Sequence, residues 1–148
     1  MTVSRAALAF LFVLSAALSA GCAPRIGDSC GNASNCSVNL DRACDTTQPG
    51  GACTVFDCQP DRCPDDAVCV RFRPVPARLM TRACMRRCGS DGDCRTGDGY
   101  RCVGIAELDE GALAEVTDVS RPDARFCVPG TMVAAPALSA PTPDAGAR

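Results

Sequence analysis

The chain has 148 residues, 13 of them cysteine, with no histidine, no tryptophan and a net charge of −2. The length allows one domain at most, and so small a charge indicates no particular partner. All 15 basic residues are arginine. Nucleophilic sites that need a histidine or lysine beside a serine or cysteine are therefore excluded, and we expect the chain not to be an enzyme.

An apolar segment follows the first positive charge of the chain. Arg5 precedes residues 6–20, which are only Ala, Leu, Phe, Val and Ser. The run is shorter than the roughly 20 apolar residues that cross a bilayer as a helix, whereas its length and its flanks are typical of a signal peptide. We predict that residues 1–21 are a lipoprotein signal peptide.

The end of this segment resembles the lipobox of bacterial lipoproteins, which here reads Ser19-Ala20-Gly21-Cys22, with Leu18 one place earlier than usual. The resemblance implies cleavage before Cys22 and acylation of Cys22, so that the lipid, including palmitate, attaches the chain to a membrane. Residues 22–29 would then be a lipid-anchored tether of roughly 25 Å. Because Ala23 stands where enteric sorting rules place Asp for retention, the resemblance implies the outer membrane. The alternative is ordinary secretory cleavage at a nearby site, such as after Ala23.

The odd number of cysteines supports the same interpretation. If Cys22 carries lipid, twelve cysteines remain, enough for six disulfides with no free thiol. A short exported chain this rich in cysteine is typical of a disulfide scaffold. We therefore predict a small disulfide-rich domain over residues 30–128.

The twelve cysteines fall into three groups of four with similar spacing. In the first and third groups, gaps of five and then seven residues separate the first three members, and the second group is a shortened version. We interpret residues of about 30–53, 58–84 and 88–127 as three repeats, with pairing inside each group. Four cysteines allow three pairings, so the connectivity stays open. The groups are Cys30, Cys36, Cys44 and Cys53; Cys58, Cys63, Cys69 and Cys84; and Cys88, Cys94, Cys102 and Cys127.

Local patterns predict short β-strands, hairpins and loops with little helix. Residues 68–72, 100–103 and 125–128 are typical of strands, and Gly50-Gly51 predicts a turn into another strand at 52–55. Residues 106–119 are a weak helix candidate that Gly111 interrupts. Residues 129–148, rich in Ala and Pro, predict a disordered tail.

The third group also resembles a known class of protein. The sequence Cys88-Gly-Ser-Asp-Gly-Asp-Cys94, followed by Gly-Tyr-Arg-Cys-Val, is similar to short Cys-rich repeats of envelope lipoproteins in GC-rich Gram-negative bacteria. The resemblance implies a location and a style of fold, and it implies no activity.

Other chemistry finds little support in the sequence. No two cysteines have the two-residue spacing typical of a zinc site and no histidine is present, so we expect no metal and no cofactor. Two pairs of acids could act as acid and base, but acids in such loops are usually solvated; the pairs are Asp65 with Asp66 and Glu107 with Asp109. Three further acids crowd one loop, namely Asp91, Asp93 and Asp98. They lack the EF-hand pattern, and they could form another kind of calcium turn or act simply as turn formers.

Six arginines between residues 71 and 87, with no acid among them, are the most unusual charge feature. They could bind an anionic lipid headgroup or an acidic glycan, or they could form a solvated loop that pairs with acids further along. The arginines are Arg71, Arg73, Arg78, Arg82, Arg86 and Arg87, and the acids are Glu107, Asp109, Glu110, Glu115 and Asp118. Phe72 is the one aromatic residue among the arginines, too few for a surface on which bases stack, so we expect no nucleic-acid partner.

Two functions fit these features. The first is a lipid-anchored structural or binding module of the cell envelope, whose partner is an envelope protein or an anionic glycan or lipid. The second is a protease inhibitor that presents the loop 70–83, with Pro76-Ala77-Arg78-Leu79 as bait for an Arg-specific protease. The sequence favours the first without identifying what is bound.

Overall fold

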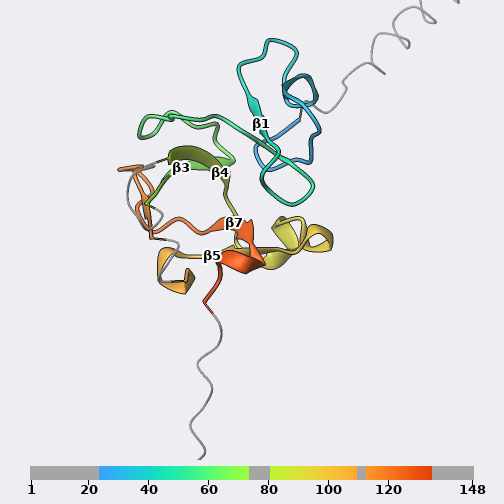
Figure 1. Cartoon of the computed structure of the whole chain (residues 1–148). Helices are drawn as coiled ribbons and strands as arrows, with labels where there is room; N and C mark the ends of the chain where they lie inside the picture. The colour runs from blue at the N-terminus through green and yellow to red at the C-terminus, as the bar shows by residue number, and fades with distance from the viewer. Residues whose placement is uncertain (1–23, 74–80, 110–112, 135–148) are drawn as a thin grey trace, which may run out of the picture.

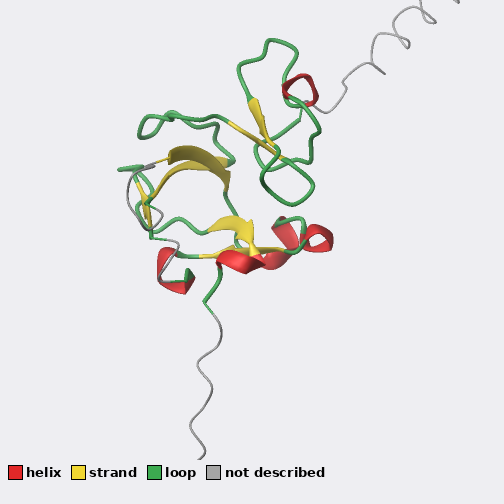
Figure 2. Ribbon diagram, viewed as in Figure 1, coloured by secondary structure: helices red, strands yellow, loops and turns green. Residues whose placement is uncertain are grey.

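The computed structural model describes residues 24–73, 81–109 and 113–134, and it shows a small cysteine-rich β fold (Figures 1 and 2). The described residues form short antiparallel strands and single turns of 3-10 helix, with no α-helix among them. None of the described helices has the length and apolar character needed to cross a membrane. The strands are β1 (Ala43–Asp45), β2 (Ala52–Thr54), β3 (Ala67–Phe72), β4 (Thr81–Arg86), β5 (Tyr100–Val103), β6 (Ala114–Val116) and β7 (Phe126–Pro129). The 3-10 turns are η2 (Ala33–Asn35), η3 (Asp91–Asp93), η4 (Thr96–Asp98), η5 (Ile105–Glu107) and η7 (Gly130–Met132).

The seven strands form three small sheets, each built on one group of cysteines. Their orders are β1-β2, β4-β3-β6 and β5-β7, and every pair is antiparallel. In each sheet the third and fourth cysteines of the group lie directly opposite each other, as Cys44 with Cys53, Cys69 with Cys84 and Cys102 with Cys127. The three groups therefore share one hairpin arrangement.

Strand β4 joins the three sheets. Beyond its pairing with β3, its outer edge forms a bridge between Ala83 and Phe56, next to β2. Just after β4, Arg87 forms a bridge with Phe126 of β7. Figure 1 accordingly shows β3 and β4 between the region of β1 and the pair β5 and β7.

The core is aliphatic and small. Val68 and Val70 of β3 pack with Phe126 and Val128 of β7 and with Val116 of β6, all of them buried. Four aromatic residues lie between Cys30 and Cys127. Two of them, Phe126 and Tyr100, are buried, whereas Phe56 is 42% exposed. A domain of this size with so little apolar bulk depends on its disulfides for stability.

The folded part begins earlier than the sequence predicted. Ile26, expected in the tether, is 1% exposed and packs on the cysteines of the second group. The Gly27 N–H donates to the Cys53 carbonyl at 2.8 Å, and Cys53 N–H donates to the Asp28 carbonyl at 2.9 Å. The prediction of a tether over 22–29 is thus wrong for residues 26–28. The buried Ile26 and the backbone hydrogen bonds of Gly27 and Asp28 hold them on the hairpin β1-β2.

Three further expectations need correction. The helix candidate 106–119 is wrong, since η5 ends at Glu107 and β6 occupies Ala114–Val116, where it pairs with the edge of β3. Both ends of the expected loop 70–83 are strand, because residues 70–72 belong to β3, residues 81–83 belong to β4, and Phe72 and Thr81 are a cross-strand pair. The expected tail starts later than residue 129, since Asp109 N–H donates to the Met132 carbonyl and Ala134 N–H donates to the Glu107 carbonyl. Residues 135–148 lie outside the described part.

Candidate functional site

All twelve cysteines from Cys30 to Cys127 form disulfides, and each disulfide lies within one group. The prediction of pairing inside the groups is therefore confirmed. In every group the first cysteine pairs with the third and the second with the fourth, which selects one of the three possible connectivities. The disulfides are Cys30–Cys44, Cys36–Cys53, Cys58–Cys69, Cys63–Cys84, Cys88–Cys102 and Cys94–Cys127.

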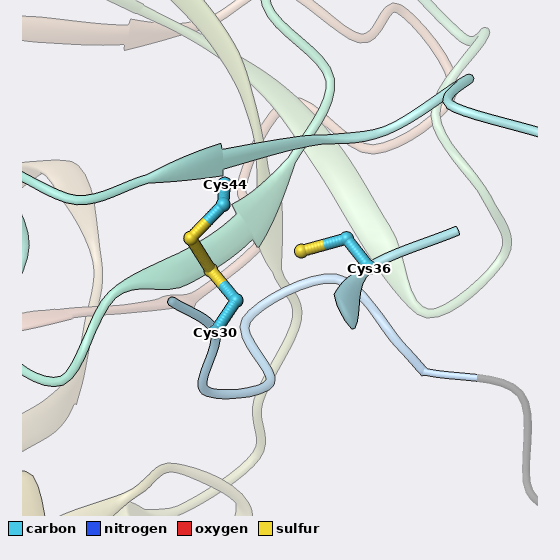
Figure 3. A group of neighbouring side chains, drawn as sticks. All are labelled: Cys30, Cys36 and Cys44. Atoms are coloured by element: carbon cyan, nitrogen blue, oxygen red, sulfur yellow. A yellow bond between two sulfur atoms is a disulfide. The ribbon is translucent and has the colours of Figure 1, made fainter. Parts of the chain in front are cut away.

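The two disulfides of a group lie against each other. Figure 3 shows the sulfur of Cys36 beside the disulfide of Cys30 and Cys44, and these three sulfurs lie within 4.8 Å of one another. The first three cysteines of the second and third groups cluster in the same way. Such clusters have the proximity of a metal site, but zinc binds thiolates, and sulfurs in disulfides carry no thiolate. The clusters are thus cross-links.

Cys22 and the expected signal peptide 1–21 lie outside the described residues. Acylation of Cys22 and attachment to the outer membrane therefore stay predictions. The described residues constrain them in one respect, because every other cysteine of the chain already has a disulfide partner.

The basic segment is divided between the two ends of the hairpin β3-β4. Arg71 and Arg73 both pair with Glu115 of β6, and the hydrogen bond from Arg71 lowers the pKa of this carboxyl. Arg82 lies opposite Arg71 in the register of the two strands. Arg86, at the other end of β4, pairs with Asp28 at 3.2 Å.

These positions do not gather all six arginines at one site. Arg87 is exposed. It follows Arg86 directly in an extended segment, so the two side chains lie on opposite faces of the sheet. Arg78 lies outside the described residues. The pairing of Arg71 and Arg73 with Glu115 fits the interpretation of a solvated basic segment with acidic partners, and anion binding by the segment stays a prediction.

Most of the acids that the sequence singled out hold turns. The Asp91 carboxylate accepts from Cys102 N–H at 2.8 Å and from Arg101, and the Cys102 contact is the main cause of its lowered pKa. Asp93 accepts from Gly89 N–H and Ser90 N–H, which lower the pKa of Asp93. Asp98 pairs with Arg95 at 2.6 Å. Asp93 and Asp98 thus have partners within their own loop, which is the role of a turn former. Asp91 instead fastens the loop to β5.

Of the paired carboxylates, Glu107 is arranged in the same way. Glu107 accepts from Gly104 N–H and pairs with Arg125 at 2.9 Å. The Gly104 contact lowers the pKa of Glu107, which is the opposite of what a general acid at neutral pH needs. Asp65 is exposed, and its carbonyl accepts from Arg121.

Sequence reasoning missed a reciprocal contact between two loops. The Asp118 carboxylate is 1% exposed and accepts from the N–H groups of Asp61 and Cys69. The Asp61 carboxylate in turn accepts from Val119 N–H, Ser120 N–H and the Ser120 hydroxyl, and the hydroxyl is the main cause of the lowered pKa of Asp61. Nothing local in the sequence indicates this pairing, because the two aspartates are 57 residues apart.

A cavity of about 530 Å³ lies where the three groups meet, and we call it the central groove. Its volume is within the range of about 300 to 1,000 Å³ for small-ligand sites. Phe72 of β3, Met85 of β4, Met132 of η7, Phe56 and Leu113 give it an apolar wall. Phe56 and Leu113 are 42% and 51% exposed, so apolar surface stays open to solvent there.

Polar groups of the central groove come from all three groups. Arg95 donates from Nη2 to the Gly51 carbonyl at 2.6 Å and to the Pro49 carbonyl at 3.2 Å, and its guanidinium lies 4.5 Å from the ring of Tyr100. The Tyr100 hydroxyl donates to the same Pro49 carbonyl, and burial raises the pKa of Tyr100. Asp45 and Arg86 complete the charged lining. These contacts fasten the turn before β2 to the third group.

The bait residues of the inhibitor hypothesis, 76–79, lie outside the described part. The strands on either side are held by Cys58–Cys69 and Cys63–Cys84. Of the expected loop 70–83, residues 70–72 and 81–83 belong to β3 and β4. The hypothesis is thus restricted to a shorter segment, and it stays a prediction.

Comparison with known proteins identifies no relative. No protein-family model, no curated protein and no solved structure matches the chain.

Proposed function

We propose that the chain is exported, acylated on Cys22 and held at the outer membrane, where it serves as a non-catalytic binding module of the cell envelope. The observation that carries the proposal is the pairing of the other twelve cysteines in six disulfides. Disulfides form in exported proteins. Cys22 has no other cysteine of the chain left to pair with. Acylation of Cys22 therefore explains why the number of cysteines is odd.

The start of the fold supports a location close to the membrane. Ile26 is already buried, only four residues after Cys22. Four residues span at most about 14 Å. A lipid on Cys22 therefore holds the domain, and the central groove with it, at the membrane surface.

The construction of the domain supports a binding role. Six disulfides and short hairpins, whose strands have three to six residues, give a rigid frame. The central groove has walls from all three groups. A preorganised site loses little entropy on binding. The shared pairing of first with third and second with fourth cysteine also supports the interpretation of 30–53, 58–84 and 88–127 as repeats of one unit.

The test is labelling with radioactive palmitate in a Gram-negative host, followed by separation of membrane and soluble fractions. The wild-type chain is expected to take up label and to sediment with the membranes, because two or more acyl chains anchor a protein stably. Cys22→Ser is expected to lose both the label and the sedimentation. Ala23→Ser, which adds a hydroxyl beside an intact Cys22, is the matched control and keeps both.

Label in the Cys22→Ser chain would show that the lipid is attached to another residue. A wild-type chain without label would contradict the proposal. The count of disulfides in Cys22→Ser separates a failure of acylation from a failure to fold, since the six disulfides do not involve residue 22.

A further inference from the structure

The wall of the central groove has the chemistry of a site for an alkyl chain. Its open part consists of Phe56 and Leu113, and the partly buried Phe72, Met85 and Met132 extend it inward. Aromatic and methionine side chains adapt to flexible apolar ligands. A ligand that covers Phe56 and Leu113 removes apolar surface from water, which is favourable.

The size of the cavity fits one chain. A methylene group is about as large as a water molecule, which occupies about 30 Å³ in the liquid. The volume of about 530 Å³ therefore corresponds to on the order of 15 methylene groups. That is enough room for one fatty acyl chain.

The charges of the lining favour an anionic end group. Arg86 and Arg95 are the positive residues of the lining and Asp45 is the negative one. Arg95 is already paired with Asp98, so Arg86 is the residue that can receive an anion. The Asp45 carboxylate is engaged by the N–H and the hydroxyl of Thr47. Arg86 uses Nη1 for Asp28, and no other described residue accepts from its remaining N–H groups. A guanidinium with such donors binds a carboxylate.

The position of the groove brings it to a source of lipid, and this step rests on the proposed function. Gly27 belongs to the lining and is five residues from Cys22. Five residues span at most about 18 Å. An acylated Cys22 thus keeps the groove within reach of the membrane surface.

We infer that the central groove binds a single-chain anionic amphiphile of the fatty-acid type, with the alkyl chain between Phe56, Phe72 and Leu113 and the carboxylate at Arg86. The module then takes up one fatty acid at the membrane surface.

The experiment is a fluorescence titration with 11-(dansylamino)undecanoic acid on the full chain carrying Cys22→Ser, which needs no detergent. Saturable binding of one probe for each chain is expected, with displacement by oleate and weaker displacement by oleyl alcohol. Arg86→Gln is expected to remove this preference for the carboxylate while the alcohol still competes.

Groove-filling variants in the same background test the location. Ala52→Trp places a large side chain in the lining at β2, and binding is expected to weaken at least about tenfold. Ala43→Trp is the matched control, because Ala43 belongs to the same hairpin, is partly buried like Ala52 and is not in the lining. Where Ala52→Trp fails to form its disulfides, Thr81→Trp fills the groove from an exposed position of β4.

Three results would overturn the inference. They are absence of saturable binding to the Cys22→Ser chain, equal affinity of Ala52→Trp and Ala43→Trp, and binding by the Cys22→Ser chain but not by the acylated chain in amphipol. The last result would assign the groove to the acyl chain of Cys22 itself. Since the titration needs no lipid on Cys22, its outcome is independent of whether Cys22 is acylated.

Discussion

Gly51 lies where the turn before β2 crosses the first disulfide group. Its φ is +64°, a conformation that side chains disfavour, and a Cβ there would overlap the Cys30 carbonyl oxygen. Gly51→Ala is therefore expected to lower the free energy of unfolding by at least about 2 kcal/mol. The measurement is guanidinium unfolding followed by circular dichroism, with the disulfides intact.

Gly97→Ala is the control for this substitution. Gly97 lies in η4, and beyond its chain neighbours no heavy atom lies within 4 Å of the place that a Cβ would occupy. It is expected to change the free energy of unfolding by less than about 0.5 kcal/mol. Equal effects of the two substitutions would contradict the close approach at Gly51.

Asp118 is the residue whose loss should matter most among the acids. Removing its carboxylate leaves the N–H groups of Asp61 and Cys69 without their acceptor in a buried place. Asp118→Ala is expected to cost about 1 to 3 kcal/mol of unfolding free energy. Asp65→Ala, at an exposed acid of the same loop region, is expected to be nearly neutral. A neutral Asp118→Ala would show that the two loops are not held by this contact.

Acid should destabilise the fold. Hydrogen bonds lower the pKa of Asp61, Asp91, Asp93, Glu107 and Glu115 below the ordinary values of 3.8 for Asp and 4.5 for Glu. A carboxyl with a lower pKa in the folded state stabilises it above the ordinary pKa, and this stability is lost as the pH falls through the lowered pKa. We expect a constant Tm above about pH 5 and a falling Tm below about pH 4. A Tm that rises on acidification would contradict these contacts.

At the scale of elements, the disulfides differ in the length of chain that they close. Cys94–Cys127 spans 33 residues and Cys58–Cys69 spans 11. In the chain-entropy account, the longer loop contributes about 1 kcal/mol more stability. Replacing Cys94 and Cys127 by Ala should therefore lower the free energy of unfolding by about 1 kcal/mol more than replacing Cys58 and Cys69. All four cysteines are buried, which makes the two double variants comparable. The reverse order would contradict the entropic origin.

The strands that the sequence predicted are those in which β-branched or aromatic residues flank a cysteine. Tyr100–Val103 coincides with β5, and the predictions at 68–72 and 125–128 coincide with β3 and β7 to within one residue. β4 was missed because its arginines and the prolines before it are typical of a loop. Its pairing depends on β3 and on the disulfide Cys63–Cys84, which brings a poor strand sequence into register.

The short strand β6 shows the same limit of local patterns. Ala114–Val116 is three residues long and pairs with the far edge of β3, more than 40 residues away along the chain. Glu115 then lies beside Arg71, and this charge offsets the two arginines that face each other across β3 and β4. A three-residue segment carries too little pattern to predict such a partner.

At the scale of the whole molecule, cysteine spacing predicted the fold class and the grouping of disulfides. It could not predict the central groove, because the groove depends on how three separately cross-linked hairpins pack. Arg95 illustrates the difficulty, since it contacts Pro49 and Gly51, 44 or more residues away. The exposure of Phe56 also depends on this packing.

The central claim is that twelve cysteines bind each other within three groups and that Cys22 alone carries lipid. Intact mass spectrometry of the purified native protein, alkylated before and after reduction, tests it most directly. The account predicts a mature chain that begins at Cys22, bears the mass of acyl chains, and reacts with no alkylating reagent before reduction and at twelve sites afterwards. A chain that begins elsewhere, or alkylation before reduction, would contradict it.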